Sequence, residues 1–233
     1  MNTYGQLVYM VIDELKGDSD DFTYTEDHVI FLLNNYRALL LKQRYSDIKR
    51  PMPESNYQTL CMETMEVPAI AGVPCEGGSY LRTVNKVPFT MKIGNPRVYP
   101  VDFYQGSNIT FISRERMKYV GYNKYMQNII YCSLGPDNYL YFTSSNPQFL
   151  YLENIKFTAV FEDARAASEL ECTPEDGKTC DIIDKVFPIE ESLVPTLIEL
   201  VVKELRPAAY SPADELNNAN DDLDNVAMTA NKK

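Results

Sequence analysis

The stretch from Thr25 to Tyr45 constrains this chain most, because it is the longest uninterrupted helical pattern and contains neither glycine nor proline. Thr25 is a favourable N-cap, and Glu26 and Asp27 would lie at the positive end of the helix dipole. Basic side chains follow near the opposite end: Arg37, Lys42 and Arg44. These features predict a single long helix.

The apolar residues of this helix extend well beyond one face. One stripe has the helical spacing of a buried face: Val29, Leu32, Leu33, Tyr36 and Leu40. A second set widens it: Ile30, Phe31, Leu39 and Leu41. A helix this apolar needs cover on more than one side, so we expect the second set to contact a neighbouring copy of the chain.

Helical patterns recur at both ends of the chain. Thr3–Lys16 has an apolar stripe, with Thr3 as a possible N-cap. Leu193–Arg206 has another, in which Pro195 fits only the first turn and Pro207 marks the end. We expect these segments to pack with Thr25–Tyr45 as a helical bundle.

The middle of the chain has a different sequence pattern. After Pro51 and Pro53, β-branched and aromatic runs replace the helical period, with turn signals between them. The expected strands lie near 57–67, 80–84, 87–93, 97–103, 109–113, 128–134, 139–143, 149–152 and 155–162. Gly135 to Asn138 is expected to form a hairpin turn. The segment 114–125 is ambiguous and could include a helical turn.

The predicted fold class is α+β, with a helical bundle from the N- and C-terminal segments and an inserted antiparallel β-sandwich or barrel. The expected organisation is a bundle from 1–50 plus 186–207, a β-sandwich domain over 56–163, an acidic loop over 164–185 and an extended tail over 208–233.

Charge and cysteine content narrow the classes of function. The net charge of −11 argues against binding to nucleic acid or to an anionic membrane. It is compatible with an acidic channel wall that lies next to DNA and repels it. The five cysteines form no Cys-x-x-Cys pair, which indicates unpaired thiols in a reducing compartment, while pairing of Cys172 with Cys180 stays open. No apolar run is long enough to span a membrane.

No catalytic or metal-binding constellation is evident. The single histidine, His28, lies in the first turn of the long helix, with no serine or cysteine motif around it. Adjacent acidic pairs are typical of solvated faces, so a carboxylate-based hydrolase is disfavoured. We therefore expect no enzyme activity, no metal and no cofactor.

One patch is both basic and aromatic. Arg114, Arg116, Lys118 and Lys124 alternate with Tyr119, Tyr122 and Tyr125. Such a patch could stack on single-stranded nucleic acid or sugar, but in an acidic chain contact with solvent or a neighbouring subunit is favoured. Tyr210 and Leu216, in the Asn- and Asp-rich tail, complete the candidate interface residues, since this tail is too polar to fold without a partner.

Several segments resemble head-to-tail adaptors of tailed bacteriophages, in particular the ring proteins of crAss-like phages. The resemblance lies in these stretches: YTEDHVIFLLNNYRALLLKQRY, RTVNKVPF, NYLYF, VFEDARAA, FPIEESLVPTLIELVVKEL and NNANDDLDN. It implies a helical bundle in a ring, a projecting β-sandwich and a tail that packs on neighbours, with no enzyme activity.

The resemblance also implies partners. We expect a ring homo-oligomer, dodecameric in such families, that binds the portal protein and other neck or tail ring proteins in the virion. Genomic DNA would pass by without specific binding, no membrane would be involved, and assembly would take place in the host cytoplasm. The alternative is a binding module whose Tyr-rich β domain recognises a glycan or protein on the host surface.

Overall fold

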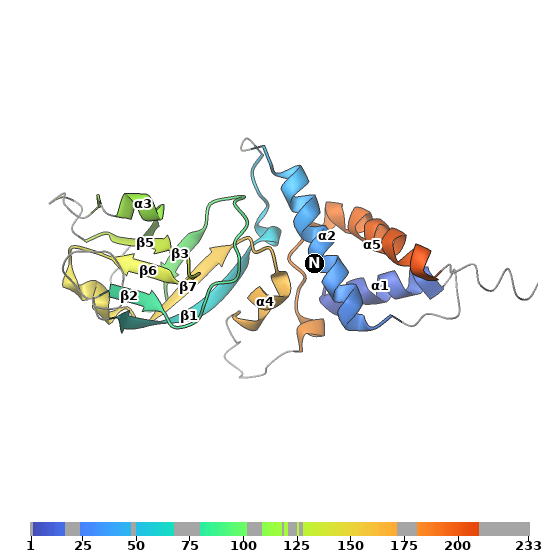
Figure 1. Ribbon diagram of the computed structural model, residues 1–233, viewed down its shortest axis with the longest axis horizontal. Coiled ribbons are helices and arrows are strands. Elements are labelled where there is room, and N and C mark those ends of the chain that lie inside the picture. Colours follow the sequence, from blue (N-terminus) through green and yellow to red (C-terminus); the bar gives the residue numbers. More distant parts are fainter. Residues whose placement is uncertain are drawn as a thin grey trace, which may run out of the picture.

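The computed structural model describes residues 2–16, 24–47, 50–67, 80–101, 109–117, 119–120, 125, 128–171 and 181–209. The molecule is elongated, with long helices at one end and a β-barrel at the other (Figure 1). The fold is therefore α+β with a barrel, as the change in sequence texture predicts.

The helical end consists of α1 (Tyr4–Lys16), α2 (Glu26–Arg44) and α5 (Val194–Ala209). Thr25 caps α2, because its side chain accepts a hydrogen bond from the backbone N–H of His28. Thr3 and Gln6 form a reciprocal capping box at the start of α1. Both predicted N-caps are confirmed.

The last helix is longer than expected. Pro195 lies in the first turn of α5, as predicted, but the helix continues past Pro207 to Ala209. A proline in the last turn removes one backbone hydrogen bond. Val202 and Leu205 are buried just before it, so packing holds this end of the helix in place.

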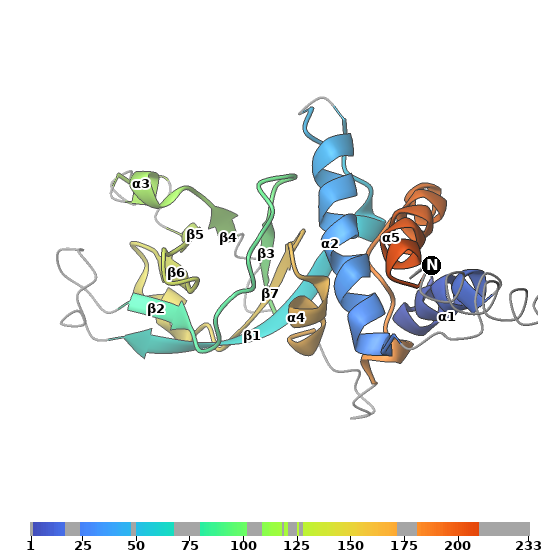
Figure 2. The same ribbon diagram turned by 45° about the vertical axis from the view of Figure 1, so that its right-hand side comes forward.

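The three helices share one hydrophobic cluster, which includes Leu7, Val11, Leu33, Leu41, Leu197 and Val201. In Figure 2, α2 stands between the barrel on one side and α1 and α5 on the other. Met91 and Val160 join the same cluster from segments that leave the barrel. The core of the helical end therefore extends to the barrel junction.

The barrel contains seven strands: β1 (Gln58–Val67), β2 (Tyr80–Thr83), β3 (Arg97–Pro100), β4 (Ile109–Phe111), β5 (Ile130–Leu134), β6 (Leu140–Thr143) and β7 (Asn154–Ala159). Their order is β1-β2-β6-β5-β4-β3-β7, and pairing of β7 with β1 closes the sheet. Inward side chains such as Leu60, Phe142 and Phe157 fill the interior. Closure pairs the outer strands, so none of the seven is left as an edge.

One pairing departs from the predicted antiparallel sheet. β4 and β5 are parallel, with Ile109 opposite Ile130. Parallel neighbours need a long crossover connection, and the chain between these strands contains the short helix α3 (Arg114–Met117). The helical turn considered for 114–125 accounts for the crossover.

Two predicted strands are absent from the barrel. Residues 87–93 form an extended segment that crosses from the barrel core at Val87 to the helical core at Met91. Residues 149–152 lie mostly in a 3₁₀ helix, η3 (Pro147–Tyr151). Both segments have the apolar composition of a strand, but their backbones serve as connections.

The predicted hairpin turn joins β5 to β6. Asn138 has φ of 63°, a left-handed conformation that asparagine tolerates better than most residues. A Cβ on Gly135 would come within 2.6 Å of the Tyr141 ring, so glycine is required there.

A short helix, α4 (Ala164–Glu169), lies between the barrel and the long helices (Figure 1). Asp163 caps it by accepting hydrogen bonds from the backbone N–H groups of Arg165 and Ala166. The Gln58 side chain of β1 donates to the Ala164 carbonyl oxygen at 3.0 Å. These contacts fix the end of the barrel that faces the helices.

Arg37 joins the helical end to the barrel. Its side chain is fully buried, and its guanidinium donates to three carbonyl oxygens: Pro188 at 2.6 Å, Phe161 at 2.8 Å and Asn56 at 3.3 Å. These carbonyls belong to the segments that connect α2 to β1, β7 to α4 and α4 to α5. Burial lowers the pKa of Arg37 to about 10, so the side chain remains protonated at neutral pH.

Glu190 forms a second junction. Its carboxylate accepts hydrogen bonds from the Tyr45 hydroxyl and from Ser192, and it lies 3.0 Å from Arg44 Nε. Its backbone N–H donates to Asn56 Oδ1 at 2.9 Å. Burial acts to raise the pKa of Glu190, but these donors outweigh it and the pKa is lowered.

We predict that Arg37→Ala lowers the free energy of unfolding by about 3–5 kcal/mol, because three buried carbonyl groups lose their donors. Chemical denaturation of both proteins measures the difference. Lys42→Ala, at an exposed position of the same helix, is the matched control and should change stability by less than about 0.5 kcal/mol. A loss below about 1 kcal/mol in Arg37→Ala would contradict this role.

We also predict a pH dependence from Glu190. Because its folded pKa lies below the ordinary value of 4.5, its ionised form stabilises the fold above that pH, and this contribution is lost as the pH falls through the folded pKa. The stability difference between the wild type and Glu190→Gln should therefore shrink on acidification from about pH 6 to about pH 3. Urea denaturation across this range measures it, with Glu199→Gln on the exposed face of α5 as control. A difference that stays constant with pH would refute the assignment.

Candidate interface surfaces

The described residues contain no cluster of three or more histidine, cysteine, aspartate or glutamate side chains that could hold a metal ion. His28 is exposed on α2, and its ring stacks on that of Tyr24 with the ring centroids 5.6 Å apart. Among the helices of the described ranges, none is both long and apolar enough to cross a membrane.

Cysteine behaviour differs from the expectation at one position. Cys61 on β1 is disulfide-bonded, so the prediction of unpaired thiols is wrong for this residue. Cys132 on β5 is a free thiol inside the barrel, and burial raises its pKa well above the usual range. The open question of Cys172 and Cys180 lies outside the described residues.

An open hollow of about 490 Å³ lies between α2, the extended segment 87–93 and the chain that enters α4. We call it the α2 groove. Its lining residues are Phe31, Asn34, Asn35, Ala38, Leu39, Lys42, Phe89, Met91, Glu162, Asp163 and Arg165. The groove exists because the segment 87–93 leaves the barrel and runs beside 160–162, where Met91 N–H donates to the Val160 carbonyl oxygen and Glu162 N–H to that of Phe89.

The groove combines exposed apolar surface with an unsatisfied acceptor. Phe31 is 59% exposed, Leu39 44% and Phe89 67%. Asn34 is only 7% exposed, and its Oδ1 atom has no hydrogen-bond partner in the described part of the chain. Buried polar atoms are normally paired. The groove therefore offers apolar contact beside a buried amide side chain.

Charged groups surround the α2 groove. Arg165 is held by Asp27 at 2.9 Å, and the carboxylate of Asp163 caps α4. Glu162 and Lys42 are exposed and form no ion pair with any described residue. The lining contains two acidic side chains, Glu162 and Asp163, and two basic ones, Lys42 and Arg165; because Arg165 is paired with Asp27, Lys42 is the basic side chain of the lining without an ion pair to a described residue.

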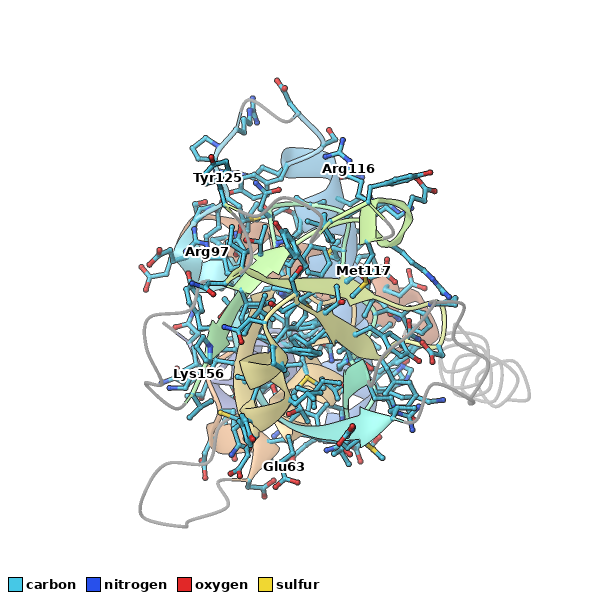
Figure 3. The ribbon with its side chains drawn as sticks, turned by 90° about the vertical axis from the view of Figure 1, so that its left-hand side faces the viewer. Glu63, Arg97, Arg116, Met117, Tyr125 and Lys156 are labelled. Carbon is cyan, nitrogen blue, oxygen red and sulfur yellow. The ribbon has the colours of Figure 1, made fainter. Side chains whose placement is uncertain are left out.

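A second surface lies at the far end of the barrel, and we call it the barrel tip. It contains the exposed side chains of Arg114 and Arg116 on α3, with Tyr119 80% exposed and Tyr125 85% exposed beyond it. Figure 3 views this end and has Arg116, Met117 and Tyr125 together in its upper part. Met117 anchors α3 to the barrel, because its sulfur accepts a hydrogen bond from Ser133 Oγ of β5 at 2.7 Å.

The structure leaves four of the predicted interface residues exposed on the surface. Phe31 and Leu39 are exposed in the α2 groove, and Tyr119 and Tyr125 are exposed at the barrel tip. Their contact with a neighbouring copy remains a prediction. Tyr122, Tyr210 and Leu216 lie outside the described residues.

Ile30 and Leu41 require a correction. They are 2% and 0% exposed and belong to the core that α2 shares with α1 and α5. The helix phase explains this, because both residues lie beside Leu33 and Arg37 on the face that packs inward. Neither is available to a neighbouring copy, so the interface prediction is wrong for both residues.

Sequence reasoning also missed two residues of the α2 groove. Asn34 was outside the apolar stripes, although it lies between Ile30 and Arg37 on the inward side of the helix. Phe89 was assigned to a strand, where one face would be buried. Its 67% exposure arises because the segment leaves the sheet, which no local pattern indicates.

Charge is distributed unevenly along the chain. Residues 58–159 contain nine Lys and Arg against seven Asp and Glu, whereas the remaining residues contain 13 against 26. The barrel segment is slightly basic and the rest of the chain strongly acidic.

Two comparisons with known proteins agree with the similarity inferred from the sequence. The family described as "Phage tail ring protein 2" matches residues 6–223. A protein named "Ring protein 2", from Bacteroides phage crAss001, is 67% identical over 221 residues, which cover 95% of this chain and 98% of that protein. The expected similarity to ring proteins of crAss-like phages is confirmed.

We predict that a charge introduced on the buried side of α2 destabilises the fold strongly, whereas a charge on its exposed side has little effect. Leu41→Glu should behave like Leu33→Glu and lower the free energy of unfolding by more than about 3 kcal/mol, because each places a carboxylate in the core. Phe31→Glu should change it by less than about 1 kcal/mol, because this side chain is already in solvent. Thermal melts followed by circular dichroism measure all three. Equal destabilisation by the three substitutions would mean that Phe31 is also part of the core.

Proposed function

The chain belongs to the phage tail ring protein 2 family, and from that membership we propose that it is a structural subunit of the virion neck that assembles into a closed ring. The ring connects the portal to the tail and lines the conduit through which the genome is ejected. Twelve copies is the number expected from the resemblance to neck adaptors. The subunit has no catalytic role in this proposal.

The observation that supports assembly is the set of exposed aromatic side chains in the α2 groove and at the barrel tip. Phe31 and Phe89 in the groove and Tyr119 and Tyr125 at the tip are each more than half exposed on one chain. Extended exposed apolar surface on a folded protein is typical of an interaction site. In a closed ring of identical copies each subunit uses two different surfaces, one for each neighbour. The α2 groove and the barrel tip are two such surfaces.

The charge of the chain is compatible with a conduit wall. A net charge of −11 repels DNA, so genomic DNA would slide past without specific binding. The partners in this proposal are further copies of the chain, the portal protein and other neck or tail rings, with assembly in the host cytoplasm. No membrane is required.

We further propose that the two ends of the molecule have separate roles. The terminal segments, 1–50 with 186–207, would form the helical bundle that sits in the ring, and the β domain, 56–163, would project from it. The residues 164–185 would link them, and the tail, 208–233, would pack on neighbouring subunits. The buried hydrogen bonds of Arg37 would keep both parts in one orientation.

Electron microscopy and native mass spectrometry of the purified protein, alone and with portal-containing particles, test this proposal. We predict closed rings of uniform copy number, and a ring bound between portal and tail in assembled particles. A protein that stays strictly monomeric and never joins portal-containing particles would refute it.

A further inference from the structure

We propose that the α2 groove of each subunit receives the barrel tip of a neighbouring copy, with Tyr119 as the inserted side chain. The inference rests on the proposed ring and names the two surfaces that would meet in it. It assigns a specific partner to a groove that the described part of the chain leaves open.

The chemistry of the groove suits a tyrosine. Phe31, Leu39 and Phe89 provide apolar walls, while Asn34 Oδ1 is a buried acceptor without a donor. A tyrosine offers a flat apolar ring and a hydroxyl that donates a hydrogen bond, and tyrosine is enriched among the residues that dominate binding energy. The polar Asn34 side chain also lines the groove, so the hydroxyl of a tyrosine would lie beside an amide there.

The barrel tip supplies such a side chain together with basic groups. Tyr119 is 80% exposed, and Arg114 and Arg116 beside it form no ion pair with any described residue. Opposite them, the groove offers the exposed carboxylate of Glu162, which forms no ion pair with any described residue, and that of Asp163, which caps α4. The basic residues of the groove lining are Lys42 and Arg165, and Arg165 is paired with Asp27. Complementary charges at the rim of an interface guide association and fix its orientation.

The barrel tip of a chain does not reach the α2 groove of the same chain. Both views show α3 at the end of the barrel that lies away from α2 (Figures 1 and 2). The groove, in contrast, is lined by residues of α2. The occupant must therefore come from another copy. Because the two surfaces differ, the contact is heterologous, which is the type of contact that generates rings.

The exposed face of α1 fits the groove less well. Tyr9 and Met10 are 62% and 44% exposed, but Asp13 and Glu14 lie on the same face. Against Glu162 and Asp163 they would bring like charges together, which is unfavourable. The asymmetry of charge between the barrel segment and the rest of the chain also favours contact of tip with groove over tip with tip.

A complementation experiment tests the inference. The tip variant carries Arg116→Glu with Tyr119→Asp, and the groove variant carries Phe31→Asp with Phe89→Asp. All four side chains are exposed, so both variants should keep the wild-type circular dichroism melt. Each variant alone should lose ring formation, but an equal mixture should form a 1:1 heterodimer and nothing larger, because only one intact tip and one intact groove remain. Native mass spectrometry resolves the two chains by mass.

The controls separate this inference from the proposed function. Tyr151→Asp, at an 85% exposed position outside both surfaces, should leave ring formation unchanged. A charge exchange, Arg116→Glu with Glu162→Arg in one chain, should restore the assembly that Arg116→Glu weakens.

Absence of the heterodimer, or rings from either variant alone, would overturn the pairing. Loss of rings through Tyr9→Asp, with the tip variant unaffected, would assign the groove to α1 instead. The proposed function would survive either result, since it depends on whether the wild type assembles and joins portal-containing particles.

Discussion

The buried guanidinium of Arg37 is the interaction on which the arrangement of this molecule depends. It donates to carbonyl oxygens of Asn56, Phe161 and Pro188, which belong to the connections between the barrel and the helices. A fully buried cation is costly unless its hydrogen bonds are made, so these three segments must converge on one point of α2. This convergence orients the barrel relative to α2 and, with the crossing segment 87–93, creates the α2 groove.

The groove illustrates how a binding surface arises from a packing constraint. α2 buries one face against α1 and α5 and turns Arg37 toward the barrel, which leaves Phe31 and Leu39 in solvent beside Phe89. The barrel is closed and its interior is filled by side chains such as Phe142 and Phe157. Recognition is therefore expected on the outside of the molecule, at its junction and at its tip, as suits the proposed ring subunit.

Sequence patterns predicted the α+β class, the three long helices, both capped N-termini and all seven strands of the barrel. These features depend on local periodicity, on capping residues and on turns such as Gly135–Asn138, so they can be read from neighbouring residues. The prediction failed where an apolar segment had a non-local role. Residues 87–93 and 149–152 look like strands but connect elements, and the parallel pairing of β4 with β5 depends on a crossover that no local signal specifies.

The same distinction holds for the candidate site. The sequence by itself determined that α2 has more apolar surface than one face can use, that the chain is acidic, and that its segments resemble crAss-like phage ring proteins. Only the tertiary structure decided which apolar residues of α2 remain exposed. Ile30 and Leu41 are in the core, whereas Phe31 and Leu39 are exposed beside a Phe89 that is distant in sequence. Periodicity fixes which residues share a helix face, but burial is set by what packs against each face, and that depends on Arg37 and the segments it holds together.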